Sequence, residues 1–260
     1  MLSINGLFNI FLPVFSHWII WLIFFAIVII DLLLYAYPYF KKPRKEFRRY
    51  HASILIANVI SLYIFTKMLE GVIYQGSILK VDAWFNEIIY SSWITNVALF
   101  ITLFGNTVII IILFMFALTV LLLRKKLRYA LLSTVAILGA LALEVAIKNL
   151  VHRARPENLI QTGFSFPSGH AMMAIIFVSL LIYSFKDNFK DKRVRYVLIT
   201  AASAFFISVG ISRIILHVHW FSDVMAGISL SLFWFMFVVL IERPIIRPIL
   251  DKFNNLSFFI

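Results

Sequence analysis

The chain has 260 residues, of which 62% are hydrophobic and 14% charged, and its mean hydropathy is +0.96. Soluble domains contain about 45–50% apolar residues, so this composition excludes a soluble globular protein and predicts a single membrane domain over residues 1–260. The net charge is +12 and there is no cysteine, which excludes disulfides, thiolate metal ligands and a cysteine nucleophile.

Apolar stretches of about 20 residues predict an all-α, polytopic transmembrane helix bundle. We expect seven spanning segments, near 17–37, 51–73, 100–123, 129–147, 170–185, 196–215 and 223–241. The first of these is an extra N-terminal helix beside six core helices. If residues 1–37 only lie in the interface, the bundle has six helices.

Basic residues mark the cytoplasmic side of the bundle. Of the 24 Lys and Arg residues, 18 lie in four short clusters, at 41–49, 124–128, 186–195 and 243–252. Cytoplasmic loops carry such an excess, so topology explains the net charge and no nucleic-acid partner is expected. The N-terminal segment and basic loop over 1–50 then lead from outside to inside, and three later segments lie outside: 74–99, 148–169 and 216–222.

Residues 78–92 have the pattern of a helix that lies in the outer interface. Apolar residues recur at helical spacing opposite a polar face formed by Lys80, Asp82, Asn86 and Glu87. The pattern leaves two roles open, a connector tucked against the bundle or an element that admits lipid.

The first outer polar stretch is Lys148-x6-Arg155-Pro156. A guanidinium fork and an ammonium point charge at this separation can close on one tetrahedral anion, although long basic side chains also reach water from the interface without any ligand. Glu144 lies one helical turn before Lys148, where it either orients the ammonium group for a ligand or forms a purely structural pair.

The second stretch, Phe166-Pro167-Ser168-Gly169-His170, opens the next span. Ser168 is a natural N-cap, Gly169 lets a ligand approach the backbone, and free N–H groups at a helix start attract phosphate. His170 then stands in the first turn beside the anion. Taken alone, a histidine at this position is more often an interfacial polar residue.

The third stretch is Ser212-Arg213-x5-His219-x3-Asp223. If the last span begins this early, His219 and Asp223 share a helix face, so the carboxylate holds one imidazole nitrogen while the other faces a substrate. Asp223 also suits the first turn of a helix without any catalytic role. Arg213 adds a third cation from another helix end.

In this order and spacing, the three stretches resemble the three-part motif of the type-2 phosphatidic acid phosphatase superfamily, and the surrounding helices resemble its membrane-integral branch. The catalytic motif region covers 148–223. The resemblance implies that His219 forms a phosphohistidine, that Asp223 orients the ring, and that His170 protonates the leaving oxygen and then activates water. It assigns the phosphoryl oxygens to Lys148, Arg155, Ser168, Gly169 and Arg213.

Two positions depart from the family pattern. His217 stands where a small residue is expected, and Trp220-Phe221 stand where a Tyr-Pro pair is more usual. The extra histidine opens a rival interpretation in which a metal is ligated by His152, His170, His217, His219 and Asp223. Three nearby cations disfavour it, so we expect no metal and no cofactor. His217 then lies behind the site or in the interface, and Arg153 and His152 are candidates to contact a second phosphate.

The sequence therefore predicts a multi-pass protein of the cell membrane that hydrolyses a lipid phosphate or polyprenyl diphosphate at the extracytoplasmic face, without metal. Two alternatives stay open, a carrier that binds the phosphorylated lipid without turnover and a phosphotransferase with an acceptor other than water. Four aromatic residues either line a path for acyl chains or anchor in the interface: Phe164, Phe166, Trp220 and Phe221. The expected partners are a membrane lipid and the bilayer, and the oligomeric state is left open.

Overall fold

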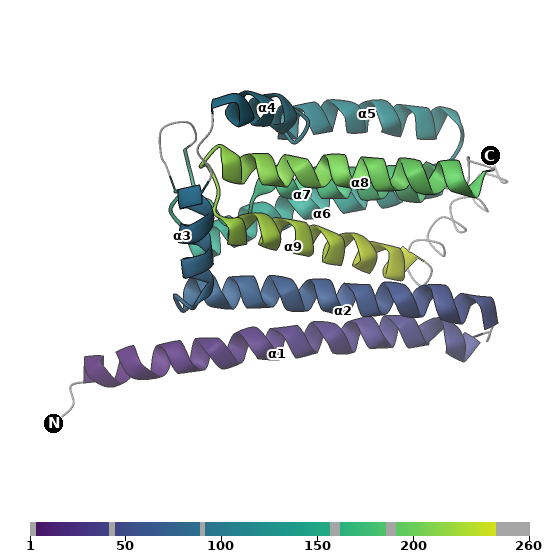
Figure 1. The fold of residues 1–260 in the computed structure, drawn as a ribbon. Helices are drawn as coiled ribbons and strands as arrows, with labels where there is room; N and C mark the ends of the chain where they lie inside the picture. The colour runs from purple at the N-terminus through teal and green to yellow at the C-terminus, as the bar shows by residue number, and fades with distance from the viewer. Residues whose placement is uncertain (1–3, 42–44, 89–91, 157–161, 186–190, 243–260) are drawn as a thin grey trace.

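The computed structural model describes residues 4–41, 45–88, 92–156, 162–185 and 191–242, and every regular element within these ranges is an α-helix. The helices are α1 (Ile4–Lys41), α2 (Lys45–Ile73), α3 (Ile78–Ile88), α4 (Ser92–Leu103), α5 (Thr107–Leu123), α6 (Leu127–Val151), α7 (Gly169–Phe185), α8 (Lys192–Ile215) and α9 (Phe221–Ile241). Figure 1 shows the long helices running side by side, with the short α3 lying across one end. The predicted all-α, polytopic bundle is confirmed.

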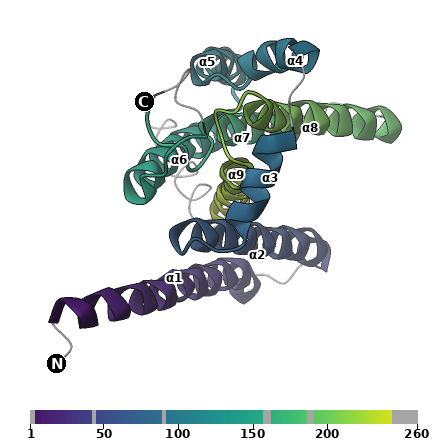
Figure 2. The same cartoon turned by 60° about the vertical axis from the view of Figure 1, so that its left-hand side comes forward.

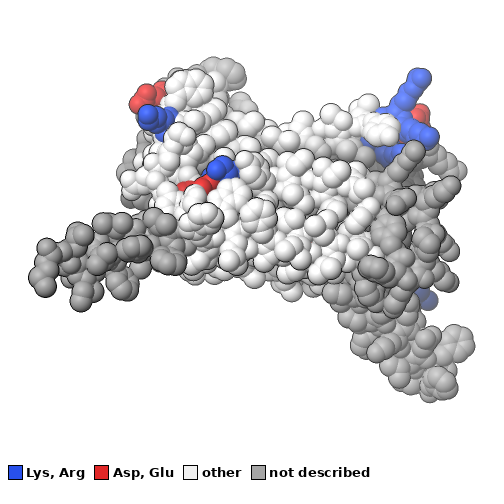
Figure 3. Space-filling view, turned by 90° about the horizontal axis from the view of Figure 1, so that it is seen from below, with Lys and Arg blue, Asp and Glu red and all other residues white. Residues whose placement is uncertain are grey.

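Most of the predicted spans are present. Within the described ranges, five helical segments are long and apolar enough to cross a membrane: His17–Ala36, Ala52–Ile73, Leu127–Val151, Lys192–Ile215 and Phe221–Ile241. The predicted span at 170–185 is α7, a shorter apolar helix whose residues Met172, Met173 and Ile176 are fully buried at the bundle centre. On the face shown in Figure 3, charged side chains gather toward the two ends, and the wide band between them is uncharged. Such a band suits contact with lipid tails.

The predicted span at 100–123 is broken into α4 and α5, which meet at a 40° bend, and it begins earlier, near Ile94. Part of the segment 74–99, which we expected outside, therefore belongs to this span. Asn106 starts α5 by accepting a hydrogen bond from the backbone N–H of Val108 over 2.9 Å. At the break, Gly105 has no room for a Cβ, because that atom would overlap Val209 Cγ1 and lie 3.2 Å from His170 Cβ. The break thus allows close packing against the start of α7.

The additional N-terminal helix α1 packs along α2 at the edge of the bundle (Figures 1 and 2). Its Trp21 and Phe24 contact the ring of Tyr63 on α2. Deeper in the span, Nδ2 of Asn58 donates to Oδ2 of Asp31 over 2.9 Å, and both side chains are fully buried. Hydrogen bonds between membrane helices contribute about 0.6 kcal/mol on average and up to about 1.7 kcal/mol, so this pair fixes α1 against α2.

The order of the helices brings four helix ends to the same end of the bundle, beneath α3: the C-terminal ends of α6 and α8 and the N-terminal ends of α7 and α9 (Figures 1 and 2). The basic residues of the α5–α6 turn and of the start of α8 lie at the opposite end. All three motif stretches are therefore on the side away from these basic clusters.

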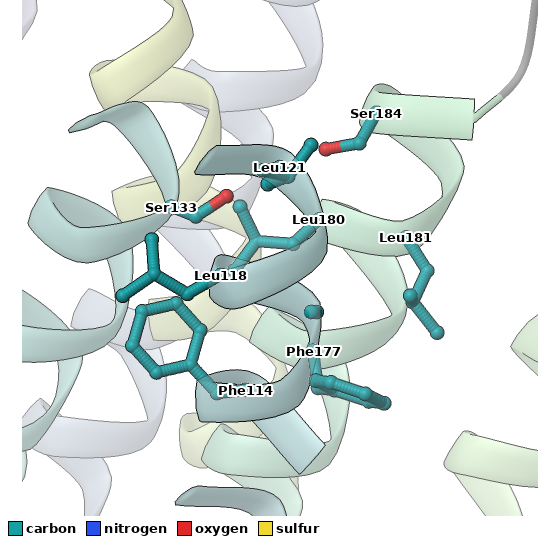
Figure 4. Close-up of a pocket in the computed structure, with 9 residues that line it drawn as sticks. Phe114, Leu118, Leu121, Ser133, Phe177, Leu180, Leu181 and Ser184 are labelled. Atoms are coloured by element: carbon teal, nitrogen blue, oxygen red, sulfur yellow. The ribbon is translucent and has the colours of Figure 1, made fainter. Parts of the chain in front are cut away.

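A small cavity lies between α5, α6 and α7, toward the end of the bundle that carries the basic clusters (Figure 4). Its volume is about 20 Å³, and its lining is mainly apolar, with the hydroxyls of Ser133 and Ser184. A cavity of this size holds about one water molecule at most. We interpret it as a packing void, distant from the motif residues.

Candidate active site

The three motif stretches converge beneath α3. They lie on the last turns of α6 and α8, the loop before α7, the first turn of α7, and the loop that leads into α9. His170, in the first turn of α7, is within electrostatic range of four other predicted site residues: Arg213, His219, Lys148 and Arg155. Residues separated by up to 71 positions in the sequence thus surround one small volume.

His219 is buried, with 2% of its surface exposed, and its partner Asp223 is fully buried. Its Nδ1 lies 3.4 Å from Oδ2 of Asp223, and that oxygen also accepts the backbone N–H of Trp220 over 3.0 Å. The helix α9 begins at Phe221, after His219 and not before it. The two side chains therefore do not share a helix face as expected. The capping contact of Asp223 with Trp220 brings the carboxylate back to the ring.

The tautomer of His219 follows from its neighbour on the other side. Nη1 of Arg155 lies 3.1 Å from Nε2 of the ring. Arginine is a donor only, so Nε2 accepts this hydrogen bond and the proton of the neutral ring is on Nδ1, facing Asp223. Burial lowers the pKa of His219 from 6.5 to about 4, and Arg155 and Arg213 add to this against the opposing effect of Asp223. The ring is neutral at physiological pH, with a lone pair on Nε2.

Arg155 is held against His219 by backbone carbonyls. Its Nη1 also donates to Val218 O over 2.8 Å, Nε donates to Gly163 O over 3.1 Å, and Nη2 donates to Phe164 O over 3.3 Å. Burial lowers the pKa of Arg155, and the negative charges of Asp223 and Glu144 oppose this effect. These contacts orient the guanidinium group without neutralising it, so its positive charge is available to an anion.

Arg213 and Ser168 carry buried polar atoms that lack partners. Nη1 of Arg213 donates to Oγ1 of Thr102 on α4 over 2.6 Å, whereas Nε and Nη2 have no hydrogen-bond partner among the described residues. Oγ of Ser168 is likewise without a partner in the described structure, so it does not make the expected N-cap bond. The backbone N–H of Ser168 donates instead to Asp223 O over 3.0 Å. Buried polar groups left unpaired are costly and call for an explanation.

Lys148 and Glu144 form the predicted pair within α6, with Nζ and Oε1 2.6 Å apart. Glu144 also packs against Gly169, because a Cβ at that glycine would overlap its carboxylate. Gly169 is thus needed for close packing of α6 against the start of α7, in addition to any contact with a ligand.

Arg153 is held by two carboxylates, and it also lines a cavity of about 490 Å³ beside Arg155. Its Nη1 donates to Oδ1 of Asp223 over 2.6 Å and to Oγ of Ser222 over 2.6 Å. Its Nη2 donates to Oδ2 of Asp82, on α3, over 2.6 Å. Arg153 therefore lies behind Asp223. Sequence reasoning missed the partner residues Asp82, Ser222 and Thr102, although the polar face of 78–92 was a signal that α3 has a buried polar contact.

The residues that depart from the family pattern connect loops to helices. His217 has a φ of 51°, and its Nδ1 lies 2.8 Å from Oδ1 of Asn86 on α3. Trp220 donates from Nε1 to Ala154 O over 3.0 Å. Among the residues that the structure describes, no group of three or more His, Asp or Glu side chains is arranged to hold a metal ion.

The four aromatic residues have different environments. Phe166 is fully buried, which excludes it from a surface path and from the interface. Phe221 stacks on Phe85 of α3 at 4.5 Å between ring centroids. Phe164 lines a cavity of about 490 Å³ together with His152, Arg155 and neighbouring loop residues. The loop residues around Arg155 therefore border a space large enough for a polar head group.

The PAP2 superfamily model matches residues 127–247, which include all three motif stretches. Residues 127–247 are thus identified as a PAP2 region. The prediction from the motifs is confirmed, and the enzyme class is that of the membrane PAP2 phosphatases. Together with the spans, this makes the chain a multi-pass membrane PAP2 protein.

Known PAP2 proteins are similar over most of the chain. Phosphatidylglycerophosphatase B of Bacillus subtilis (strain 168) is 27% identical over an alignment of length 198, which covers 72% of this chain and 96% of that protein. The crystal structure of a transmembrane PAP2-type phosphatidylglycerolphosphate phosphatase from Bacillus subtilis has a TM-score of 0.62 at 24% identity, covering 72% of this chain and 96% of that one. Aquifex aeolicus LpxE gives a TM-score of 0.47 at 18% identity, covering 62% and 93%.

Proposed function

We propose that this PAP2 protein hydrolyses a lipid phosphate through a covalent intermediate on Nε2 of His219. The observation that carries the proposal is the state of that ring. Its proton is on Nδ1 facing Asp223, and its lone pair is on the nitrogen next to the guanidinium of Arg155. A buried, neutral imidazole beside a fixed cation is suited to attack the phosphorus of an anionic ester.

In the first half of the reaction, Nε2 forms a bond to phosphorus as the bond from phosphorus to the lipid oxygen breaks. His170 gives its proton to that oxygen, and Asp223 balances the positive charge that develops on the imidazole. In the second half, His170 takes a proton from a water molecule, whose oxygen displaces His219 from phosphorus and releases inorganic phosphate.

The cations of the site compensate the charge of the phosphoryl group. Arg155 exchanges its hydrogen bond to Nε2 for one to a phosphoryl oxygen as the nucleophile is engaged. Nε and Nη2 of Arg213 and Oγ of Ser168, which find no partner within the described residues, would donate to the other oxygens. Lys148 adds a third positive charge. Phosphoryl transfer depends mainly on positioning and charge stabilisation. We therefore propose that these groups position and stabilise the transferred phosphoryl group without a metal ion.

For the substrate we propose a lipid monophosphate of the phosphatidylglycerol phosphate type. The name of the Bacillus subtilis relative, which this chain covers almost completely, supports this class. Arg153 also favours a monophosphate over a polyprenyl diphosphate, because Asp82 and Asp223 occupy its donors. The basic clusters at the opposite end of the bundle support an active site on the extracytoplasmic face of the cell membrane.

The proposal is tested with purified protein in detergent, EDTA, and a panel of phosphatidylglycerol phosphate, phosphatidic acid and undecaprenyl diphosphate. We expect release of inorganic phosphate, fastest from phosphatidylglycerol phosphate, and its loss in His219→Ala. His17→Gln, a histidine change on α1, is the matched control and should keep full activity. Lipid binding without phosphate release would instead establish a carrier, and a phosphorylated acceptor without free phosphate would establish a phosphotransferase.

The orientation is tested separately in intact cells. The chain has no cysteine, so Thr162→Cys, at an exposed position beside the site, introduces a single thiol. A membrane-impermeant maleimide should label it from outside the cell. Labelling that requires permeabilised cells would overturn the extracytoplasmic assignment.

A further inference from the structure

Asp82 is a buried carboxylate on α3 to which the proposed reaction assigns no role. Only 2% of its surface is exposed, although α3 lies across the end of the bundle (Figures 1 and 2). Oδ1 accepts the backbone N–H of Ser222 over 2.8 Å, and Oδ2 accepts the hydroxyl of Ser222 over 2.7 Å and Nη2 of Arg153 over 2.6 Å. Asp82 therefore contacts the residue immediately before Asp223 and the cation that binds Asp223.

These contacts form one continuous chain to the nucleophile. Asp82 binds Arg153, Arg153 binds Oδ1 of Asp223 over 2.6 Å, and Oδ2 of Asp223 faces Nδ1 of His219. The guanidinium group is 10% exposed and also lies over the ring of Trp220, 5.3 Å from its centroid. It is therefore fixed between the two carboxylates.

The charges of Asp82, Arg153 and Asp223 explain why a second carboxylate is needed. Asp223 and Arg153 together are neutral, so Arg153 alone would cancel much of the negative potential that Asp223 exerts on the imidazole. With Asp82 the group of three carries one net negative charge. Buried charges interact strongly because screening by water is weak there. The third charge thus restores the attraction between Asp223 and an imidazole that becomes positive during attack.

Docking of α3 on the bundle does not depend on Asp82 alone. Phe85 stacks on Phe221, and Asn86 contacts His217, so an apolar and a polar contact hold the same helix. A charge on Asp82 is therefore separable from the packing of α3.

We propose that Asp82 is a positioning residue for the reaction: through Arg153 it holds Asp223 in place and preserves its negative charge toward His219. The role rests on the proposed phosphohistidine mechanism. It assigns a catalytic purpose to the outer interfacial helix, whose charged face supports the nucleophile from behind.

The test compares Asp82→Asn with Glu87→Gln, a matched loss of one negative charge at an exposed position of the same helix. We expect Asp82→Asn to lower kcat by about tenfold to a hundredfold, the range seen when partners that orient metal-ligating residues are lost. Its KM should stay within about threefold, since Asp82 does not touch the phosphate. Formation of phosphohistidine from ³²P-labelled lipid in a single turnover should slow by the same factor. Glu87→Gln should behave as the unaltered protein does.

Further variants separate this role from a purely structural one. Asp82→Glu keeps the charge and should recover most of kcat. Asp82→Ser is made in parallel as a second uncharged variant, and only variants that melt within a few degrees of the unaltered protein are compared. In an Arg153→Gln background, loss of the Asp82 charge should have little further effect, because the role acts through Arg153.

A kcat within twofold of the unaltered protein for the folded uncharged variants would overturn the proposal, as would a loss in Asp82→Glu as large as in Asp82→Asn. Additive effects of Asp82→Asn and Arg153→Gln would also overturn it. Failure of the unaltered protein to hydrolyse any lipid phosphate is a distinct outcome, which removes the proposed function itself.

Discussion

Replacing Arg213 with methionine should stabilise the protein while removing most of its activity. The guanidinium group is 3% exposed and has one hydrogen bond, to Thr102, while two of its nitrogens have no partner in the described structure. Methionine fills much of the same space without charge. In the proposed function, this buried cation gains its missing partners when the phosphate binds.

The two effects have opposite signs and can each be estimated. A buried donor without a partner costs about 1–3 kcal/mol. Two such nitrogens outweigh the one bond to Thr102, so Arg213→Met should gain about 1 kcal/mol of stability. For a chain of this size, this raises Tm by about 2–4 °C. Loss of a donor to the phosphoryl group in the transition state should lower kcat by about 10²–10³-fold.

Thermal unfolding in detergent, followed by tryptophan fluorescence, gives Tm with and without inorganic phosphate. Phosphate release from the lipid gives kcat. Phosphate should raise the Tm of the unaltered protein and have little effect on Arg213→Met, because a ligand stabilises the folded state in proportion to its binding. Arg213→Lys, which keeps the charge but not the fork, should fall between the two in activity. A variant Arg213→Met that unfolds at a lower temperature and still hydrolyses lipid would refute the reasoning.

Two more predictions follow from buried groups. Burial lowers the pKa of His219 to about 4, so its neutral form persists as the pH falls from 7 to 5. The value of kcat/KM, corrected for ionisation of the substrate, should therefore decline only as the pH approaches 4. A decline near pH 6.5 that is caused by His219 would contradict the effect of burial. Asn58→Leu, which leaves Asp31 without its interhelical hydrogen bond, should lower stability by about 0.5–2 kcal/mol. Its activity should stay unchanged below the unfolding transition, measured beside Asn58→Gln, because the pair lies within α1 and α2, away from the motif residues.

The sequence was sufficient to predict the helical bundle and the convergence of the three motif stretches. Length and hydropathy determine the spans, and alternation of the spans places stretches 148–169 and 216–222 on one side. What it could not supply were contacts between residues far apart in the chain. Asp82 lies 71 positions before Arg153 and 140 before Ser222, and no periodicity records such a pairing.

Local geometry near the motifs was also beyond the sequence. The expectation that His219 and Asp223 share a helix face failed because the side chain of Asp223 caps its own helix, which delays the start of α9 to Phe221. The break at Gly105 escaped notice because the long stretches before Gly105 and after Thr107 are apolar. Hydropathy averaged over this length indicates a single span, where packing against Val209 and His170 requires two helices.

The shortness of α7 has a consequence for how a lipid reaches the enzyme. Its 17 residues rise about 26 Å, which is less than the roughly 30 Å of a typical hydrocarbon layer. Gly169, in its first turn, is buried, and α3 lies across that end of the bundle (Figure 1). We expect turnover to depend on bilayer thickness, because a thicker hydrocarbon layer would place the first turn of α7 farther from the lipid head groups.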